Sequence, residues 1–351
     1  MRLLLDPDTL PAPAPGRAPL LHRLLDDALR LPPEYGDGLS SHLPMALAAL
    51  DGLGAGEARL REFCARYAAR FEGAPPVAAP RAEPACGDWT ARLGCFDAWP
   101  VLRAHFAAAL AERGRDAVLA ASLPVLVLGV GAVAFHGLIR TAHAVESGHE
   151  GELGAALAYW AARWLPLEAP AGPAVDYSTA ADWLDALDAR LRVADAGWTA
   201  GGRLIVDRMR DATRTTAYRQ LAGRRVERPL VALGDLARAA AARYAATRNF
   251  TVLHLVTGAR AARVLGPWLS RHEAALAPLW HAVAAASLAS RVAGAPRARI
   301  AVEPLSWPEV RARAIASDDD HVVKLVHAAS SQVAFDPDPV WLAAARVAVS
   351  D

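Results

Sequence analysis

Apolar residues recur at spacings of three and four along most of the chain. This spacing places them on one face of an α-helix. The alternation of every second residue that marks a half-buried strand is nearly absent. The pattern predicts helices over residues 20–31, 43–53, 57–71, 153–165, 180–193, 230–246, 250–269, 272–292 and 319–333.

Residues 117–139 form a longer apolar run that carries no formal charge. By length the run could cross a bilayer, which takes about 20 apolar residues. Pro124, Gly129, Gly131 and His136 interrupt it, and no second run of this kind follows. A helix that is apolar on all sides is also typical of the centre of a large helical protein. We therefore expect a buried helix here and no membrane partner.

The chain as a whole is predicted to be one all-α domain. It has 351 residues, of which 54% are hydrophobic and 21% charged, so a disordered or fibrous protein is excluded. Proline-rich breaks at 74–84, 165–173 and 295–308 separate helices without long polar linkers. We expect an N-terminal extension over residues 1–19 and a single helical domain over 20–351.

Charge and cysteine content narrow the classes of function. The formal net charge is +1, which leaves no basic excess to neutralise nucleic-acid phosphates. The three cysteines are odd in number and form no C-x-x-C pair, which argues against a disulfide framework and a cysteine-based zinc site. The apolar run before Asp6 is short for a signal peptide. These features favour a cytoplasmic protein.

The sequence contains neither of two common phosphate-binding motifs in the context that each requires. Gly129-Val-Gly131-Ala-Val-Ala134 resembles the dinucleotide fingerprint, but it lies in a helical neighbourhood and lacks the strand that must precede it. Close packing of helices on small residues explains it better. The only lysine is not preceded by glycines, so a P-loop is absent from the sequence.

Histidines supply the candidate chemistry. Several of the 11 histidines lie in apolar helical segments rather than on polar surfaces. A lone histidine on an apolar face is usually a hydrogen-bonded core residue, but several on different helices favour a shared inward metal site. The positions are His42, His136, His143, His254, His321 and His327.

Lys324 is the only lysine in the chain, since every other residue in the Lys and Arg count is arginine. A buried lysine amine can lose its proton, and arginine cannot replace it in that role. A neutral amine can take up CO2 to give a carbamate, which is an anionic oxygen ligand. The alternative is an ion pair with Asp320. In a helix capped by an aspartate at 318–320, His321 and Lys324 share one face.

His136 and His143 are seven residues apart, so on one helix they share a face but lie about 10 Å apart. We therefore expect them not to bind the same ion. His143 and Glu146, three residues apart, are expected to form a separate pair beside the metal or substrate. A di-iron carboxylate bundle needs paired Glu-x-x-His motifs, and the sequence has none.

Four segments resemble the questin oxidase-like family in sequence, order and spacing. They are SHLPMAL at 41–47, AFHGLIR at 134–140, FTVLHLVTG at 250–258 and DHVVKLVH at 320–327. The resemblance spans roughly residues 20–345. It implies iron held by His42, His136, His254 and His321, with Lys324 as a carbamate. His143 and His327 do not belong to the family pattern. Together with Glu146 they are candidate catalytic residues outside the metal ligands.

The resemblance also implies a function. Members of the family are oxygenases that open or modify anthraquinone-type rings in polyketide biosynthesis. We expect a mononuclear non-haem Fe(II) oxygenase, a dioxygenase, acting with O2 on a small polycyclic aromatic or quinone metabolite. The reaction expected is oxidative ring cleavage or a Baeyer–Villiger-type oxidation. One alternative is a metal-free, NADPH-dependent oxidoreductase, against which the missing Rossmann pattern speaks. Another is a non-catalytic helical protein that binds an aromatic ligand.

Overall fold

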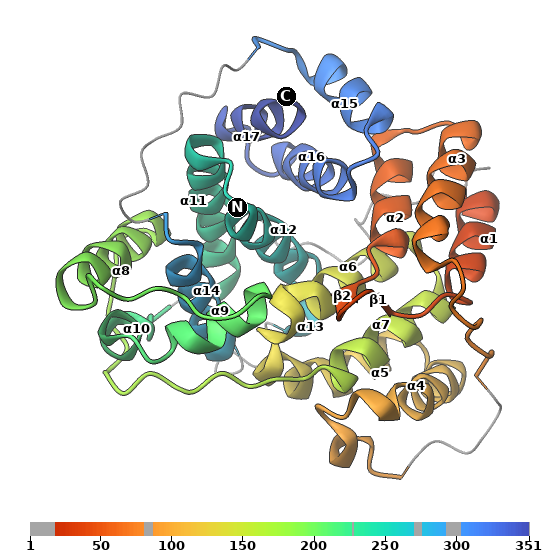
Figure 1. Cartoon of the computed structure of the whole chain (residues 1–351), viewed down its shortest axis with the longest axis horizontal. Helices are drawn as coiled ribbons and strands as arrows, with labels where there is room; N and C mark the ends of the chain where they lie inside the picture. The colour runs from red at the N-terminus through yellow and green to blue at the C-terminus, as the bar shows by residue number, and fades with distance from the viewer. Residues whose placement is uncertain (1–17, 81–86, 227, 270–275, 293–302, 351) are drawn as a thin grey trace.

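The computed structural model describes residues 18–80, 87–226, 228–269, 276–292 and 303–350, and the regular secondary structure in these residues is almost entirely helical (Figure 1). The helices are α1 Ala18–Ala28, α2 Leu43–Leu53, α3 Glu57–Ala68, α4 Trp99–Arg113, α5 Arg115–Leu126, α6 His136–Ser147, α7 Glu150–Ala162, α8 Ala180–Ala194, α9 Ile205–Ala212, α10 Thr216–Leu221, α11 Pro229–Thr247, α12 Phe250–Val264, α13 Gly266–Leu269, α14 Ala277–Ser290, α15 Trp307–Ala316, α16 Asp320–Val333 and α17 Val340–Val349. The all-α prediction is confirmed.

Two short strands form an antiparallel hairpin ahead of α2. They are β1 Glu34–Tyr35 and β2 Leu39–Ser40, and Gly36 and Gly38 adopt positive φ in the turn between them. Glu34 on this hairpin accepts a hydrogen bond from Tyr159 Oη at 2.9 Å. The hairpin thereby fixes the point at which the chain enters α2.

Most predicted helices agree with the structure within a few residues. The predicted helix 43–53 coincides with α2, and the predicted helix 250–269 is divided at Leu265 into α12 and α13. Residues 1–17 of the expected N-terminal extension lie outside the described residues. The start of the predicted helix 272–292 also falls outside them, at residues 270–275.

The apolar run 117–139 is not one helix, which corrects that expectation. After α5 ends at Leu126, the chain makes a 3₁₀ turn at Val127–Gly129 and then a kinked, non-helical turn at Ala132–Phe135 before α6 begins. A Cβ built at Gly129 would lie 2.4 Å from Trp164, so the glycine permits close packing, as the sequence suggested. In the described part of the chain, no helix is long and apolar enough to cross a membrane.

Four helices that are far apart in the sequence surround the centre of the fold. α2 packs on α6, α6 on α12, α12 on α16, and α16 on α2, so the contacts form a closed circuit (Figure 1). α7 lies behind α6, where the fully buried Trp160 fills the space left by Gly137. Trp160 is therefore part of the core.

We expect Gly137→Ala to lower the free energy of unfolding by about 1–3 kcal/mol, the usual cost of overpacking a core. A Cβ at Gly137 would lie 2.5 Å from Trp160 Cγ. Guanidinium denaturation followed by circular dichroism measures the change. Gly234→Ala in α11 is the matched control, because no described atom lies within 4 Å of its new methyl group. That control should stabilise the chain by up to about 1 kcal/mol. Equal effects of the two variants would contradict the packing argument.

Candidate metal centre

Four buried or half-buried histidines lie at the N-terminal ends of the four central helices. His42 is the N-cap of α2, His136 is the first residue of α6, His254 lies in the first turns of α12, and His321 is the second residue of α16. Local sequence determines two of these starts. The Asn249 side chain caps α12 by accepting from Thr251 N–H, and the Asp319 side chain caps α16 by accepting from His321 N–H.

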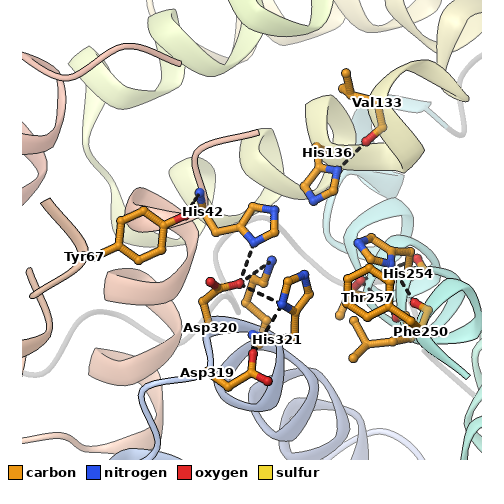
Figure 2. Close-up of polar contacts among 12 residues, drawn as sticks. His42, Tyr67, Val133, His136, Phe250, His254, Thr257, Asp319, Asp320 and His321 are labelled. Carbon is orange, nitrogen blue, oxygen red and sulfur yellow. Dashed lines mark hydrogen bonds and ion pairs between the residues drawn. The ribbon is translucent and has the colours of Figure 1, made fainter. Parts of the chain in front are cut away.

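The four imidazoles form a closed ring (Figure 2). Ring centroids are 4.6 Å apart for His42 and His136, 5.0 Å for His136 and His254, 5.7 Å for His254 and His321, and 4.7 Å for His321 and His42. The structure thus brings together the four histidines that the sequence analysis assigned to a metal. We call this group the histidine ring.

In every imidazole of the histidine ring, Nδ1 faces an oxygen atom. His136 Nδ1 donates to the Val133 carbonyl and His254 Nδ1 to the Phe250 carbonyl at 2.9 Å. His42 Nδ1 lies 2.5 Å from Asp320 Oδ1, and His321 Nδ1 lies 3.1 Å from the same oxygen. Carbonyl and carboxylate oxygens only accept, so each Nδ1 carries the hydrogen and each neutral ring keeps its lone pair on Nε2.

These Nε2 lone pairs have the chemistry of metal ligands. Within the described residues, His136 Nε2 and His321 Nε2 are buried and have no hydrogen-bond partner. A metal-bound histidine commonly donates its other N–H to a carboxylate or a backbone carbonyl, which fixes the orientation of the ring. Every member of the histidine ring has such an acceptor.

Asp320 is the carboxylate of the site. Donor atoms of His42, Asp320 and His321 all lie within 4.8 Å of one another, so these three residues could also hold an ion by themselves. Lys324 Nζ lies 3.6 Å from Asp320 Oδ1, and Arg70 Nη1 lies 3.4 Å from Oδ2. Burial raises the pKa of Asp320, but His42, Lys324 and His321 outweigh it and hold that pKa well below its usual value.

Lys324 is buried, with a side-chain exposure of 3%. Burial lowers its pKa, and the neighbouring Asp320 opposes this shift only in part. The ion pair that the sequence analysis named as the alternative for Lys324 is therefore present. Even with this ion pair, the pKa of Lys324 is lower than that of a lysine in water, so the amine loses its proton more readily.

Three histidines of the ring, His42, His136 and His254, resist protonation. Burial is the main cause of the lowered pKa of His42, which falls to about 3, with a further contribution from the charge on Lys324. Burial likewise lowers the pKa of His136 and of His254 well below the usual value. The positive ends of four helix dipoles meet here as well, which disfavours added positive charge. The imidazoles of His42, His136 and His254 are consequently neutral near pH 7, as metal ligands must be.

A strained turn precedes His136. Val133, Ala134 and Phe135 have φ values of 43°, 54° and 68°, and none is a glycine. Left-handed residues of this type cost about 1–2 kcal/mol each. The turn directs the Val133 carbonyl toward His136 Nδ1 (Figure 2), so it fixes the orientation of this imidazole.

Phe250 forms the outer edge of the histidine ring. Its side chain contacts His254 and His321 edge-on, with centroid distances of 5.0 and 4.6 Å. The residue is 51% exposed, although it begins α12 beside buried histidines. An aromatic surface therefore lies where the histidine ring comes closest to solvent.

His143, Glu146 and His327, the candidate catalytic residues, lie in a second cluster away from the histidine ring. The rings of His143 and His327 are 5.3 Å apart, and His143 Nδ1 lies 3.9 Å from Glu146 Oε2. His143 is seven residues beyond His136 on α6, which confirms that these two histidines lie on one helix. The structure thus groups the three residues together without placing them among the ring nitrogens.

Sequence reasoning missed three contributors to these sites. Asp320 was considered as a cap or a partner of Lys324, whereas it also contacts two imidazoles. Arg260 pairs with Glu146 in the second cluster, and Phe250 borders the ring. The sequence offered one signal, since Asp320 and Phe250 both lie within the segments that carry the family resemblance.

We expect Ala134→Gly to stabilise the chain by about 0.5–1 kcal/mol, which is the left-handed penalty less the contribution of one buried methyl group. The same substitution in α6, Ala142→Gly, should instead destabilise it by about 1 kcal/mol or more. Chemical denaturation of both variants measures the difference. A loss of stability in Ala134→Gly as large as in Ala142→Gly would contradict the strain.

We expect the metal-free chain to lose stability as the pH falls below about 6.5, the pKa of histidine in an unfolded chain. The pKa values of His42, His136 and His254 are lower in the folded chain, so the unfolded chain binds protons first and is favoured by acid. For His42 the loss continues to about pH 3. Denaturation of the wild type and of His254→Gln between about pH 8 and 5 tests this. The variant should show the shallower dependence, and identical slopes would contradict the assignment.

Comparison with known proteins assigns the chain to a family. A family model described as questin oxidase-like matches residues 39–329, which include the whole histidine ring and Lys324. No curated protein sequence matches the chain. The match covers most of the chain, and membership implies an oxidoreductase of the oxygenase type. The chain belongs to the questin oxidase-like family.

Proposed function

We propose that the protein is a mononuclear non-haem iron oxygenase that acts with O2 on a polycyclic aromatic or quinone metabolite. The observation that carries this proposal is the histidine ring, in which four Nδ1 atoms are engaged by oxygens and four Nε2 lone pairs are left as ligands. Imidazole and carboxylate donors suit iron. Iron bound there would supply the electron transfer that activates dioxygen.

The proposed ligands are His42, His136, His254 and His321, with Lys324 as a carbamate. In forming the carbamate, the neutral Nζ attacks the carbon of CO2 and a new N–C bond forms. One C=O π bond of CO2 breaks, its electron pair moves to that oxygen, and one proton leaves the nitrogen. The product is an anion, which attracts a metal ion, whereas the ammonium form of Lys324 would repel it. Four helix N-termini point at this site, so anionic ligands balance both the dipoles and a divalent ion. Asp320 supplies a second negative charge, and Arg70 remains as its partner.

The substrate class rests on the family membership and on the surroundings of the ring. Phe250, half-exposed and in contact with two imidazoles, offers an aromatic edge against which a flat ring can pack. We propose that it helps to orient the substrate next to the histidine ring. The second cluster of His143, Glu146 and His327 lies away from this surface. We propose that these residues act on the metal ligands rather than on the substrate.

We expect elemental mass spectrometry of untagged protein, loaded anaerobically with Fe(II), to find about one iron per chain. Lys324→Ala and His254→Ala should lose this iron, and His281→Ala on α14 should keep it because His281 lies outside the ring. Full iron content and activity in Lys324→Ala would contradict the carbamate.

A spectroscopic measurement tests the carbamate directly. Lys324 is the only lysine, so carbon-13-labelled bicarbonate should give a single side-chain carbamate signal in the NMR spectrum. Lys324→Arg keeps a positive charge but lacks a reactive amine, so the signal should disappear in this variant. A signal that persists in Lys324→Arg would assign it to another amine.

A further inference from the structure

Three arginines follow one side of α3 and contact the loop between α15 and α16. Arg59 and Arg66 lie on α3 and Arg70 directly follows it, at spacings of seven and four residues that return to the same side of a helix. The loop consists of residues 317–319 and leads into Asp320, the first residue of α16. The end of α3 therefore borders the segment that brings the carboxylate of the candidate metal centre into place.

Arg59 binds the backbone ahead of this loop and within it. Its Nε donates to the Ile315 carbonyl at 2.6 Å, and its Nη2 donates to the Ser317 carbonyl at 2.7 Å. Carbonyls at the C-terminal end of a helix lack partners within the helix, and a positive charge is favourable there. The Arg59 side chain is 14% exposed, and its Cζ lies 5.4 Å from the centre of the Phe63 ring. The guanidinium is thus held in one orientation, and it holds the loop in turn.

Direct contacts continue from this loop to the histidine ring. Ser317 Oγ accepts from the Asp319 N–H at 3.1 Å, and Asp319 Oδ1 accepts from the His321 N–H at 2.8 Å. Asp320 Oδ1 lies 3.1 Å from His321 Nδ1 and 2.5 Å from His42 Nδ1. Every step from Ser317 to His42 is therefore a polar contact of 3.1 Å or less.

The α3 helix also holds the His42 side of the ring. Tyr67 Oη accepts a hydrogen bond from the His42 backbone N–H at 2.8 Å, and Tyr67 is buried. Tyr67 lies eight residues beyond Arg59 on the same helix, which corresponds to about 12 Å along its axis. One rigid element thus binds the backbone of His42 at one end and the backbone ahead of His321 at the other.

Arg66 meets the same loop in a different way. Its guanidinium pairs with the Asp318 and Glu62 side chains, and 54% of the Arg66 side chain is exposed. Arg59 shares the Asp318 carboxylate, to which its Nη2 donates at 3.0 Å. Exposed ion pairs contribute little to stability. Loss of the Arg66 charge should therefore leave the loop backbone in place, whereas loss of Arg59 should release it.

We propose that Arg59 is a positioning residue of the metal centre, which sets the place of Asp320 and His321 against His42 by binding two carbonyls ahead of α16. This inference rests on the proposed function, because the position of these residues matters to a metal that they surround. Arg59 acts through the loop backbone. Metal ligands reach a precise geometry only when the residues around them are themselves held in place.

The test is a titration of metal-free full-length protein with Co(II), whose visible absorption reports both affinity and ligand geometry. Arg59→Met keeps the apolar stem and loses the donors, so the Kd for cobalt should rise about tenfold, the lower end of the effect of removing hydrogen bonds that orient metal ligands. The absorption bands should shift as well. Arg66→Met removes the same charge beside the same loop and should match the wild type.

A second control separates positioning from general stability. Leu191 is buried on α8, outside the four central helices, and Leu191→Ala should lower resistance to urea. Its cobalt affinity and spectrum should be those of the wild type. Wild-type affinity and spectrum in Arg59→Met would overturn the proposal. An equal loss in Arg66→Met would also overturn it, because the effect would then belong to the charge, and an equal loss in Leu191→Ala would assign it to stability.

Hydrogen exchange keeps the inference separate from the proposed function. If the wild type takes up no cobalt, the metal centre fails, and exchange in the metal-free protein decides whether Arg59 positions the loop. Peptides that cover residues 315–321 should exchange about tenfold faster in Arg59→Met than in the wild type, since local opening becomes easier. Arg66→Met should show wild-type exchange. Equal exchange in Arg59→Met and the wild type overturns the inference whatever the cobalt result.

Discussion

The buried carboxylate of Asp320 is the constraint on which the candidate site depends. Removing an ionised carboxylate from water costs several kcal/mol unless partners surround it. Its partners come from separate parts of the chain: His42 precedes α2, Arg70 follows α3, and His321 and Lys324 lie on α16 itself. The start of α16 is therefore held against α2 and the end of α3 by electrostatics as well as by apolar packing.

The same arrangement explains why the histidine ring tolerates its unfavourable features. Buried neutral imidazoles, four helix N-termini and a left-handed turn at Val133–Phe135 each oppose folding. The large apolar core around them supplies the compensating free energy. Functional sites typically contain such unfavourable features, which the rest of the fold compensates. The site is thereby pre-organised, because its ring orientations are set by protein oxygens before any ligand is present.

Much of this could be predicted from the sequence, for identifiable reasons. Spacing of apolar residues located the helices, and histidines in apolar segments gave six candidate ligands. The resemblance to the questin oxidase-like family then selected the four histidines of the ring. The turn before His136 could not be predicted, because none of its three left-handed residues is a glycine, the residue that normally adopts positive φ. The roles of Asp320 and Arg260 depend on contacts between helices more than 100 residues apart, which periodicity does not encode.

The histidine ring and the second cluster of His143, Glu146 and His327 also determine how the central helices fit together lengthwise. If α16 moved by one turn along its neighbours, Asp320 would leave His42 and His327 would no longer lie against Gly52. A uniformly apolar interface between alanine-rich helices would resist such sliding only weakly. Buried polar residues at two levels allow a single alignment, much as one buried asparagine selects the pairing of a coiled coil. The residues proposed for chemistry thus also select one packing arrangement among many similar ones.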